Sequence, residues 1–413
     1  MKKNAFYAQS GGVTSVINAS ASAVILEARK SSQIGKVYAG KNGILGALRE
    51  ELIDTSKESK KFIESLQYRP GGVFGSCRYK LKEIDENLSE YERLIEVFKA
   101  HNIGYFFYNG GNDSADTALK ISQISNKLNY PLQCIAIPKT VDNDLAVTDC
   151  CPGFGSVAKY VVTSTIEAAL DVESMHESST KVFILEVMGR HAGWIAGSSC
   201  LAKNSHPGAP HIILLPEVSF HQTKFLAKVK QIVKKNGFCV IVASEGVKDS
   251  KGKFLAESDS KDAFGHSQLG GVAPRLADLI NKKLKLKNHW AVADYLQRSA
   301  THLSSGVDRA HAYEVGKKAV EYAVEGLNGV MPVIKRKSSM PYKWEVIPAP
   351  LTKIANVEKK LPAGFITKDG FGMTKKAYSY FQPLIEGKIE EVKNINYQAG
   401  KMQMASKKLK AWR

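Results

Sequence analysis

The sequence predicts an α/β protein built on mostly parallel sheets. Short apolar runs, which are typical of buried strands, alternate with amphipathic segments from the N-terminus to about residue 330. A polar loop follows each run, and a helical pattern follows each loop. This order is typical of parallel strands with helices over both faces of the sheet. Ligands bind at the carboxyl ends of such strands, so we expect the functional residues in these loops.

The individual elements follow from the same patterns. Strands are expected at residues 4–9, 105–108, 134–137, 182–187, 212–215 and 239–243. Helices are expected at residues 15–29, 88–100 and 116–125. In the second helix Leu94, Ile95 and Phe98 fall on one face. Turn residues near Gly153 separate two such series. After about residue 331 the chain becomes rich in lysine and proline, so we expect a peripheral extension there, with short strands and a helix or two.

Length and composition narrow the class of protein. The chain has 413 residues, of which 44% are hydrophobic and 24% charged, which is ordinary for a soluble protein of two to three domains. No apolar run approaches the ~18 residues of a membrane span, and the N-terminus lacks the apolar region of a signal peptide. None of the six cysteines forms a Cys-x-x-Cys pair. We therefore expect reduced thiols in a cytoplasmic protein without a membrane partner.

The strong positive charge indicates anionic partners. The 58 lysines and arginines exceed the 40 acidic residues by 18, but they are spread along the whole chain. We expect most of them on solvated helix faces, with an attraction for phosphorylated metabolites as a secondary effect. A dedicated nucleic-acid surface is the reading that this distribution favours least.

The loop at residues 138–144 carries the most chemistry. It follows a buried strand and supplies Lys139, Thr140, Asp142, Asn143 and Asp144. A carboxylate beside a substrate hydroxyl can take its proton as a phosphoryl group arrives, and a neighbouring lysine can neutralise phosphate charge. A surface turn would explain the Asp-Asn-Asp run but leaves the adjoining lysine and threonine unexplained. We therefore interpret this loop as part of a phosphate-transfer site.

Two glycine pairs also follow strands and precede helices. Gly11-Gly12 comes directly after the first strand, and Gly110-Gly111 precedes Asn112-Asp113-Ser114. Glycines let the backbone approach an anion, and a helix N-terminus adds partial positive charge. The first pair alone is more typical of a plain turn, and Asp113 or Ser114 could be no more than a helix cap. Together with the 138–144 loop they indicate a phosphate and metal site.

Further polar residues stand at strand ends. Arg190, Arg78 and the Tyr295–Arg298 pair could bind an anion, and Glu245 could bind sugar hydroxyls. Met188 is more typical of core packing, and a single arginine such as Arg78 is about as often part of a surface ion pair.

Six motifs in order make the chain resemble the phosphofructokinase family over about residues 4–330. They are Gly11-Gly12, Gly110-Gly111-Asn112-Asp113-Ser114, Thr140-Val141-Asp142-Asn143-Asp144, Met188-Gly189-Arg190, Ser244-Glu245-Gly246 and Tyr295-Leu296-Gln297-Arg298. The resemblance implies two similar Rossmann-like α/β domains with mostly parallel sheets and an active-site cleft between them. It also implies Mg²⁺-dependent phosphoryl transfer to the 1-hydroxyl of fructose 6-phosphate.

The resemblance implies a role for each matching residue. Asp142 would be the general base, and the other catalytic residues would be Lys139, Asp113, Thr140 and Arg190. Pyrophosphate would contact Gly12, Gly111, Arg78 and Lys139. The sugar phosphate would contact Thr140, Val141, Asp142, Lys181, Met188, Gly189, Arg190, Glu245, Tyr295 and Arg298. The metal would bind at Asn112 and Asp144. Asn112 stands where the family usually has aspartate, so either its carbonyl binds the metal or Asp113 carries more of that duty.

The phosphoryl donor follows from two positions. ATP-using members usually have glycine where this chain has Asp113 and Lys139, whereas the pyrophosphate-dependent branch has large charged residues. An Asp113 side chain would crowd and repel the α-phosphate of ATP, and Lys139 can hold the phosphate end of pyrophosphate. We therefore expect a reversible pyrophosphate-dependent enzyme. An ATP-dependent 6-phosphofructokinase or a related sugar-phosphate kinase is the alternative.

The resemblance also suggests how the chain is divided. Residues 1–153 with about 299–335 would form a larger domain for pyrophosphate and Mg²⁺, and residues 154–298 a smaller domain for the sugar phosphate. Residues 336–413 would form a basic C-terminal extension. Lys181 falls where the family often has a basic residue that reaches the sugar phosphate of a neighbouring subunit, so a homodimer is expected.

Overall fold

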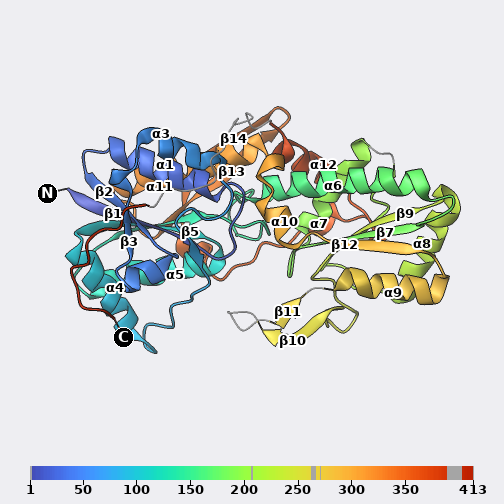
Figure 1. The fold of residues 1–413 in the computed structure, drawn as a ribbon, viewed down its shortest axis with the longest axis horizontal. Coiled ribbons are helices and arrows are strands. Elements are labelled where there is room, and N and C mark those ends of the chain that lie inside the picture. The colour runs from blue at the N-terminus through green and yellow to red at the C-terminus, as the bar shows by residue number, and fades with distance from the viewer. Residues whose placement is uncertain (1, 206–207, 262–266, 270, 388–401, 413) are drawn as a thin grey trace.

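Two β-sheets organise the chain in a computed structural model that describes residues 2–205, 208–261, 267–269, 271–387 and 402–412. Each sheet lies between layers of helices, and the two halves stand side by side (Figure 1). Most strand pairs in both sheets are parallel. The predicted α/β class with mostly parallel sheets is confirmed.

The larger sheet has the strand order β14-β13-β6-β5-β1-β2-β3, and β4 pairs with β1. Its strands are β1 (Lys3–Ser10), β2 (Ile34–Gly40), β3 (Leu52–Asp54), β4 (Ser76–Cys77), β5 (Ile103–Gly110), β6 (Gln133–Pro138), β13 (Val330–Ser339) and β14 (Tyr342–Pro350). Only the outer pairs β2–β3 and β13–β14 are antiparallel among the described residues. In the register Gln9 pairs with Asn109, and Gly110 pairs with Pro138. The loops after β1, β5 and β6 therefore leave the sheet at the same edge.

The smaller sheet has the order β12-β7-β9-β8 and is parallel throughout. Its strands are β7 (Val182–Val187), β8 (Ile212–Leu214), β9 (Cys239–Ser244) and β12 (Asn288–Val292). A separate antiparallel pair consists of β10 (Glu257–Lys261) and β11 (Ser267–Leu269).

Helices cover both faces of each sheet. In the larger half α1 (Ile17–Lys30), α3 (Lys60–Ser65) and α11 (Gly306–Val324) lie on one side, and α4 (Leu88–Ala100) and α5 (Asn112–Lys127) on the other (Figure 1). The remaining helices are α2 (Ile44–Leu48), α6 (Phe154–Met175), α7 (Trp194–Ser198), α8 (Gln222–Asn236), α9 (Val272–Leu284), α10 (Asp294–Ser299) and α12 (Lys375–Phe381). No helix in the described part of the chain combines the length and apolarity that crossing a membrane requires.

Side-chain alternation explains why the larger sheet is buried on both faces. On β1 Ala5 and Tyr7 pack with the α1 and α11 side, whereas Phe6 and Ala8 pack with the α4 side. Successive strand residues point to opposite faces, and all four are fully buried. A strand of this kind reads as a continuous apolar run, which is why the sequence revealed it.

The predicted helix at 116–125 is too short at its start. In the structure α5 begins at Asn112, because the amides of Ser114 and Ala115 already donate to Gly111 O, at 3.1 and 3.0 Å. The polar residues that follow the glycine pair thus form the first turn of the helix. Their side chains are held at a helix N-terminus and not in an open loop.

The expectation of a peripheral extension after residue 331 is wrong for much of that segment. Strand β13 joins the larger sheet beside β6, and β14 forms its edge. Phe381 in α12 is fully buried, and its ring lies 5.9 Å from that of Phe154 and 6.3 Å from that of Trp194. Aromatic contacts of this kind bury part of a lysine-rich segment. The bounds proposed for the domains stay a prediction.

Candidate active site

A cavity of about 970 Å³ lies between the two halves, at the carboxyl ends of strands from both sheets. The predicted site residues that line it are Gly12, Arg78, Gly111, Asn112, Asp113, Lys139, Thr140, Val141, Asp142, Asp144, Met188, Arg190, Glu245, Tyr295 and Arg298. Residues 12 to 144 of this set come from the larger half, and the others come from the smaller half. The fold thus brings together motifs that are nearly 300 residues apart.

The wall from the larger half uses backbone that only glycine fits. Gly11 has a φ of +71°. At Gly110 a Cβ would lie 2.0 Å from Ser114 Oγ, so any side chain would displace the first turn of α5. The chain therefore passes close to the cavity with Gly12 and Gly111 exposing backbone, and α5 directs its N-terminus at the same space. Such a wall is suited to anionic groups.

Lys139 lies buried under this wall. Its residue surface is only 4% exposed, and Nζ donates to Gly12 O at 2.6 Å. Burial, followed by the positive charges of Arg298 and Arg78, lowers the pKa of Lys139 to about 7. A bound anion would reverse these effects, because it favours the charged ammonium form. Lys139, Arg78 and Arg298 thus bring three basic side chains close to Gly12.

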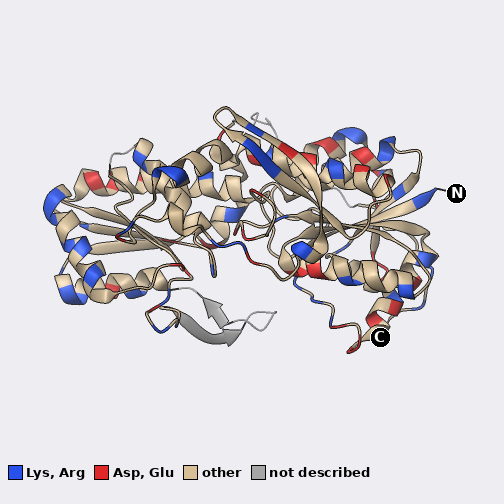
Figure 2. Cartoon of the chain, turned by 180° about the vertical axis from the view of Figure 1, so that it is seen from behind, with Lys and Arg blue, Asp and Glu red and all other residues tan. Residues whose placement is uncertain are grey.

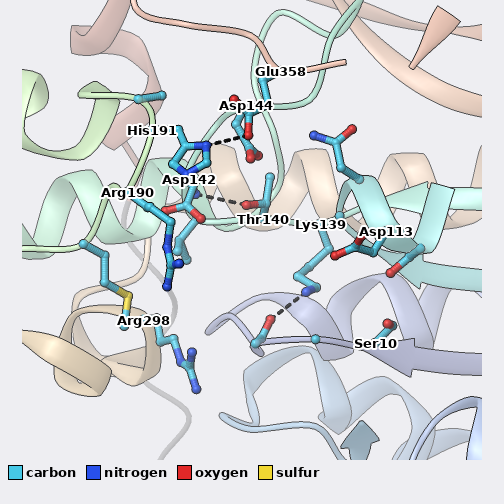
Figure 3. A pocket seen from close by; sticks show the side chains of 18 of the residues that line it. Ser10, Asp113, Lys139, Thr140, Asp142, Asp144, Arg190, His191, Arg298 and Glu358 are labelled. Carbon is cyan, nitrogen blue, oxygen red and sulfur yellow. Dashed lines mark hydrogen bonds and ion pairs between the residues drawn. The ribbon is translucent and has the colours of Figure 1, made fainter. Parts of the chain in front are cut away.

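Arg298 reaches from the smaller half toward the glycines of the larger half. A Cβ on Gly12 would lie only 2.7 Å from Arg298 Nη1, so the absence of a side chain there makes room for the guanidinium. The guanidinium carbon also stacks 3.8 Å from the centre of the Tyr295 ring. Figure 3 shows Arg298 and Arg190 on one side of the cavity and Lys139 and Asp113 on the other.

Asp142 and Asp144 lie between these walls on the loop after β6. The Asp142 amide donates to Thr140 Oγ1 at 3.1 Å, which fixes the turn. Burial, and then the negative charge of Asp144, raises the pKa of the Asp142 carboxyl, while Lys139 and Arg190 oppose the shift. Burial also raises the pKa of Asp144, to which the charge of Glu358 contributes. A carboxyl with a raised pKa is suited to accept a proton near neutral pH.

The smaller half contributes an interlocked pair of loops after β7 and β9. Gly189, with a φ of +133°, donates its amide to Glu245 Oε1 at 3.3 Å, and its carbonyl accepts from Ser244 Oγ at 2.5 Å. A Cβ on Gly189 would lie 2.7 Å from Ala192 O. These contacts orient Glu245 and bring Met188 and Arg190 to the cavity wall. Gly189 itself contributes through these backbone contacts, which position the residues of the cavity wall.

Asp113 lies at the cavity rim in the first turn of α5. Its carboxylate is 3.4 Å from Lys80 Nζ, and both side chains are about half exposed. The predicted role of Asp113 in limiting the size of the donor pocket stays a prediction.

Lys181 lies away from this cavity. Its ammonium group donates to the carbonyls of His176 and Glu177 at the end of α6, and it precedes β7, whereas the cavity residues follow that strand. A contact with this chain's own cavity is therefore excluded by position. The predicted contact across a subunit interface stays a prediction.

Sequence reasoning missed the residues that the C-terminal segment brings to the cavity. Asn356, Glu358 and Lys360 line it, and Glu358 Oε1 lies 2.8 Å from His191 Nδ1 (Figure 3). Nothing in the Lys-rich sequence around them marks a site, and the recognised motifs end before residue 300. Their position depends on long-range packing, which no local pattern reveals.

Asn112 faces the same segment. Its amide nitrogen, oriented to donate, lies 3.0 Å from Ile354 O and 3.3 Å from Val357 O. In this orientation the amide oxygen of Asn112 faces hydrogen-bond donors, and the predicted ligand role depends on that one atom.

Comparisons with known proteins agree with this geometry. A family model described as Phosphofructokinase matches residues 4–323. The pyrophosphate–fructose 6-phosphate 1-phosphotransferase of Methylococcus capsulatus is 59% identical over 386 residues, or 93% of this chain and 92% of that protein. The protein of the same name from Halomonas elongata is 60% identical over 385 residues, with 93% and 92% covered. The crystal structure of a pyrophosphate-dependent phosphofructokinase from Marinobacter aquaeolei is similar with a TM-score of 0.90 and 55% identity, and 99% of each chain is covered.

Proposed function

Because the chain belongs to the phosphofructokinase family, we propose that it transfers a phosphoryl group from pyrophosphate to the 1-hydroxyl of fructose 6-phosphate. The products are fructose 1,6-bisphosphate and phosphate, and the reaction runs in both directions. The observation that carries this proposal is the buried Lys139, which lies on the donor side of the cavity, where Arg78 adds a second positive charge. Two cations on the donor side of the cavity fit a small, highly charged donor.

Asp142 acts as the general base. Its carboxylate takes the proton of the 1-hydroxyl while that oxygen forms a bond to the nearer phosphorus of pyrophosphate. The bond from this phosphorus to the bridging oxygen breaks, and phosphate leaves. Lys139 and Arg78 stabilise the negative charge on the transferring and departing groups. Thr140 holds the turn that presents Asp142, through its hydrogen bond to the Asp142 amide.

The two walls of the cavity bind different substrates. Gly12, Gly111, Arg78 and Lys139 hold pyrophosphate against backbone and cations. Val141, Met188, Arg190 and Glu245 contact the sugar, with Gly189 orienting Glu245. Tyr295 and Arg298 bind its 6-phosphate from α10. Asp113 limits the space beyond the second phosphate of the donor.

Mg²⁺ belongs to this proposal as the partner of pyrophosphate. No group of three or more histidine, cysteine or acidic residues able to hold a metal occurs in the described residues. The metal would bind one or two protein groups and take its other ligands from water and substrate phosphate. Asp144 and the amide oxygen of Asn112 would hold it. When bound, the ion neutralises charge on the phosphate oxygens.

Titration of Lys139 makes pyrophosphate binding depend on protons. Its pKa is lowered to about 7, so at pH 8 it is mostly neutral in the free enzyme, and a bound anion draws a proton onto it. At pH 6 it is already charged. Calorimetry in two buffers of different ionisation enthalpy should therefore show about one more proton taken up per site at pH 8 than at pH 6. Lys139→Arg, which stays charged at both pH values, should lack this difference, and equal uptake by both proteins would contradict it.

A homodimer in the cytoplasm completes the proposal. The edge strand β12 and the neighbouring α10 expose Trp290, Val292 and Leu296, at 48%, 40% and 65%. An unpaired edge with apolar side chains favours a second subunit. The six cysteines are free thiols, which suits a reducing compartment.

Light scattering tests the dimer. The wild-type chain should have twice the mass of one chain, and Trp290→Glu should shift it toward monomers. Met340→Glu, at an equally apolar site in the turn between β13 and β14 that is 92% exposed, serves as the control and should leave the dimer intact. A monomeric wild type would contradict this part of the proposal.

The reverse reaction tests the proposed chemistry. Enzyme incubated with fructose 1,6-bisphosphate, phosphate and Mg²⁺ should form pyrophosphate, which ³¹P NMR follows directly. Release of phosphate without any pyrophosphate would indicate hydrolysis and would contradict the proposal.

A further inference from the structure

Residues 354–361, which we term the strap, run beside the loop after β6, which carries Asp142 and Asp144. The strap lies outside residues 4–323, the part that matches the family model. Glu358 forms an antiparallel bridge with Leu145, and the Lys359 amide donates to Asp144 O at 2.6 Å. The strap is thus hydrogen bonded to the backbone that carries Asp142 and Asp144.

Both halves of the molecule hold the strap. On the side of α5, Asn112 contacts the carbonyls of Ile354 and Val357, and Asn356 Nδ2 donates to Asp116 Oδ1 at 3.0 Å. On the side of the smaller sheet, Trp194 Nε1 donates to Lys359 O at 3.0 Å. A segment that is anchored on both sides of the cavity has a defined position relative to each wall.

The Lys359 side chain forms hydrogen bonds to residues 143–149 of this loop. Nζ donates to Thr148 O and Asp149 O, both at 2.9 Å, and lies 3.4 Å from Asn143 Oδ1. The ammonium group also lies 5.1 Å from the centre of the Trp194 ring, within the range of a cation–π contact. All of its donors are therefore directed at one loop and at one side chain of the opposite wall.

Tyr380, from α12, supports the same loop. Its hydroxyl donates to Asp149 O at 2.5 Å and accepts from Asn143 Nδ2 at 3.0 Å. Asn143 is fully buried and has a φ of +55°, a conformation that its surroundings must maintain. Because Asn143 lies between Asp142 and Asp144, its position sets the direction of both carboxylates.

We propose that Lys359 and Tyr380 are positioning residues for phosphoryl transfer, which hold Asn143 and the 148–149 carbonyls so that Asp142 faces the substrate. This inference rests on the proposed function, because it takes Asp142 as the base. It assigns a catalytic purpose to a segment beyond the family match. A displacement of about 1 Å at a reacting group can cost roughly 10²-fold in rate, so loss of either contact should lower kcat.

Kinetics of three variants test the inference. Lys359→Met keeps the length of the side chain without its charge, and should lower kcat by about 10–100-fold with both KM values within about threefold of wild type. Lys359→Arg, which keeps the charge and donors, should recover most of the loss. Lys353→Met replaces an exposed lysine of the preceding turn and should match wild type. Unchanged kcat in Lys359→Met, or no recovery in Lys359→Arg, would overturn the inference.

A fourth variant covers the case in which Lys359→Met does not fold. Tyr380→Phe keeps the ring and removes only the hydroxyl, and it should lower kcat by about tenfold at unchanged KM. Wild-type kcat in Tyr380→Phe would overturn the inference equally. Melting temperatures of all variants identify losses that follow from unfolding.

Hydrogen exchange separates this inference from the proposed function. Amides of residues 142–151 should exchange faster in Lys359→Met than in wild type and Lys353→Met, whatever reaction the enzyme catalyses. If wild-type enzyme is inactive with pyrophosphate and fructose 6-phosphate, the proposed function is wrong. Faster exchange in Lys359→Met would still show that Lys359 stabilises the loop. Equal exchange in all three proteins would overturn it.

Discussion

Replacement of Asp142 by asparagine should lower kcat by about 10²–10⁴-fold, the usual contribution of a general base. The amide keeps the shape of the side chain, and the hydrogen bond that fixes the turn comes from the Asp142 backbone amide, which the substitution leaves in place. Fructose 6-phosphate should therefore bind to the variant with an affinity within a few-fold of wild type. Steady-state rates and equilibrium binding measure the two effects separately, and an unchanged kcat would remove Asp142 as the base.

The pH profile gives this prediction a second readout. A base must be deprotonated, so kcat/KM is present above its pKa and lost as the pH falls through it. Burial and the charge of Asp144 raise the pKa of Asp142, so the loss should occur above the ~4 of an ordinary aspartate. The profile of Asp142→Asn should lack this acid limb. If kcat/KM of the variant fell over the same acidic pH range as that of wild type, the acid limb would belong to a group other than Asp142.

The combined replacement of Asp113 and Lys139 by glycine should change the donor. Loss of the Lys139 ammonium removes a buried cation from the phosphate site, and kcat/KM for pyrophosphate should fall by about 10²–10³-fold. The space released at both positions should admit a nucleotide, so that activity with ATP becomes measurable. Donor-dependent rates for wild type and variant provide the measurement.

Single variants show whether the charge or the volume of a side chain determines which donor the enzyme uses. Lys139→Met removes the charge but fills the same volume, so it should weaken the use of pyrophosphate without creating activity with ATP. Asp113→Asn removes the charge that faces Lys80 and should have little effect on stability, because that exposed ion pair contributes little. If Lys139→Met used ATP as well as the double variant does, space would not be what limits the donor.

The layered fold could be predicted from the sequence because both sheets are buried on both faces. Strands such as residues 134–137 then read as continuous apolar runs, and α4 follows its predicted bounds of 88–100 because Leu94 and Phe98 mark its buried face. The segment after residue 335 could not be predicted in this way. Its burial depends on contacts such as Phe381 with Phe154, which join residues far apart in the sequence.

The motif residues of the site could be predicted because parallel strands place their following loops at one edge. The sequence does not reveal how the two walls meet, so the approach of Arg298 to Gly12 was not foreseen. The same holds for Lys359, whose neighbours in sequence are one glutamate and one further lysine. Its three acceptors are backbone or amide oxygens of a distant loop, which carry no sequence signal.

The positive charge of the chain is distributed as its sequence suggested. Figure 2 shows lysine and arginine on helices of both halves, with acidic residues among them. Several of the lysines pair with nearby carboxylates, as Lys317 and Lys318 do with Glu321. The cations that matter for the proposed reaction are Lys139, Arg78 and Arg298, which meet around Gly12.

The choice of donor tests the central claim most directly. Purified wild-type enzyme is supplied with fructose 6-phosphate, Mg²⁺ and either pyrophosphate or ATP, and formation of fructose 1,6-bisphosphate is followed by a coupled assay. The pocket closed by Asp113 and Lys139 predicts rapid formation with pyrophosphate and a rate with ATP that is at or near background. Phosphorylation with ATP and none with pyrophosphate would contradict it.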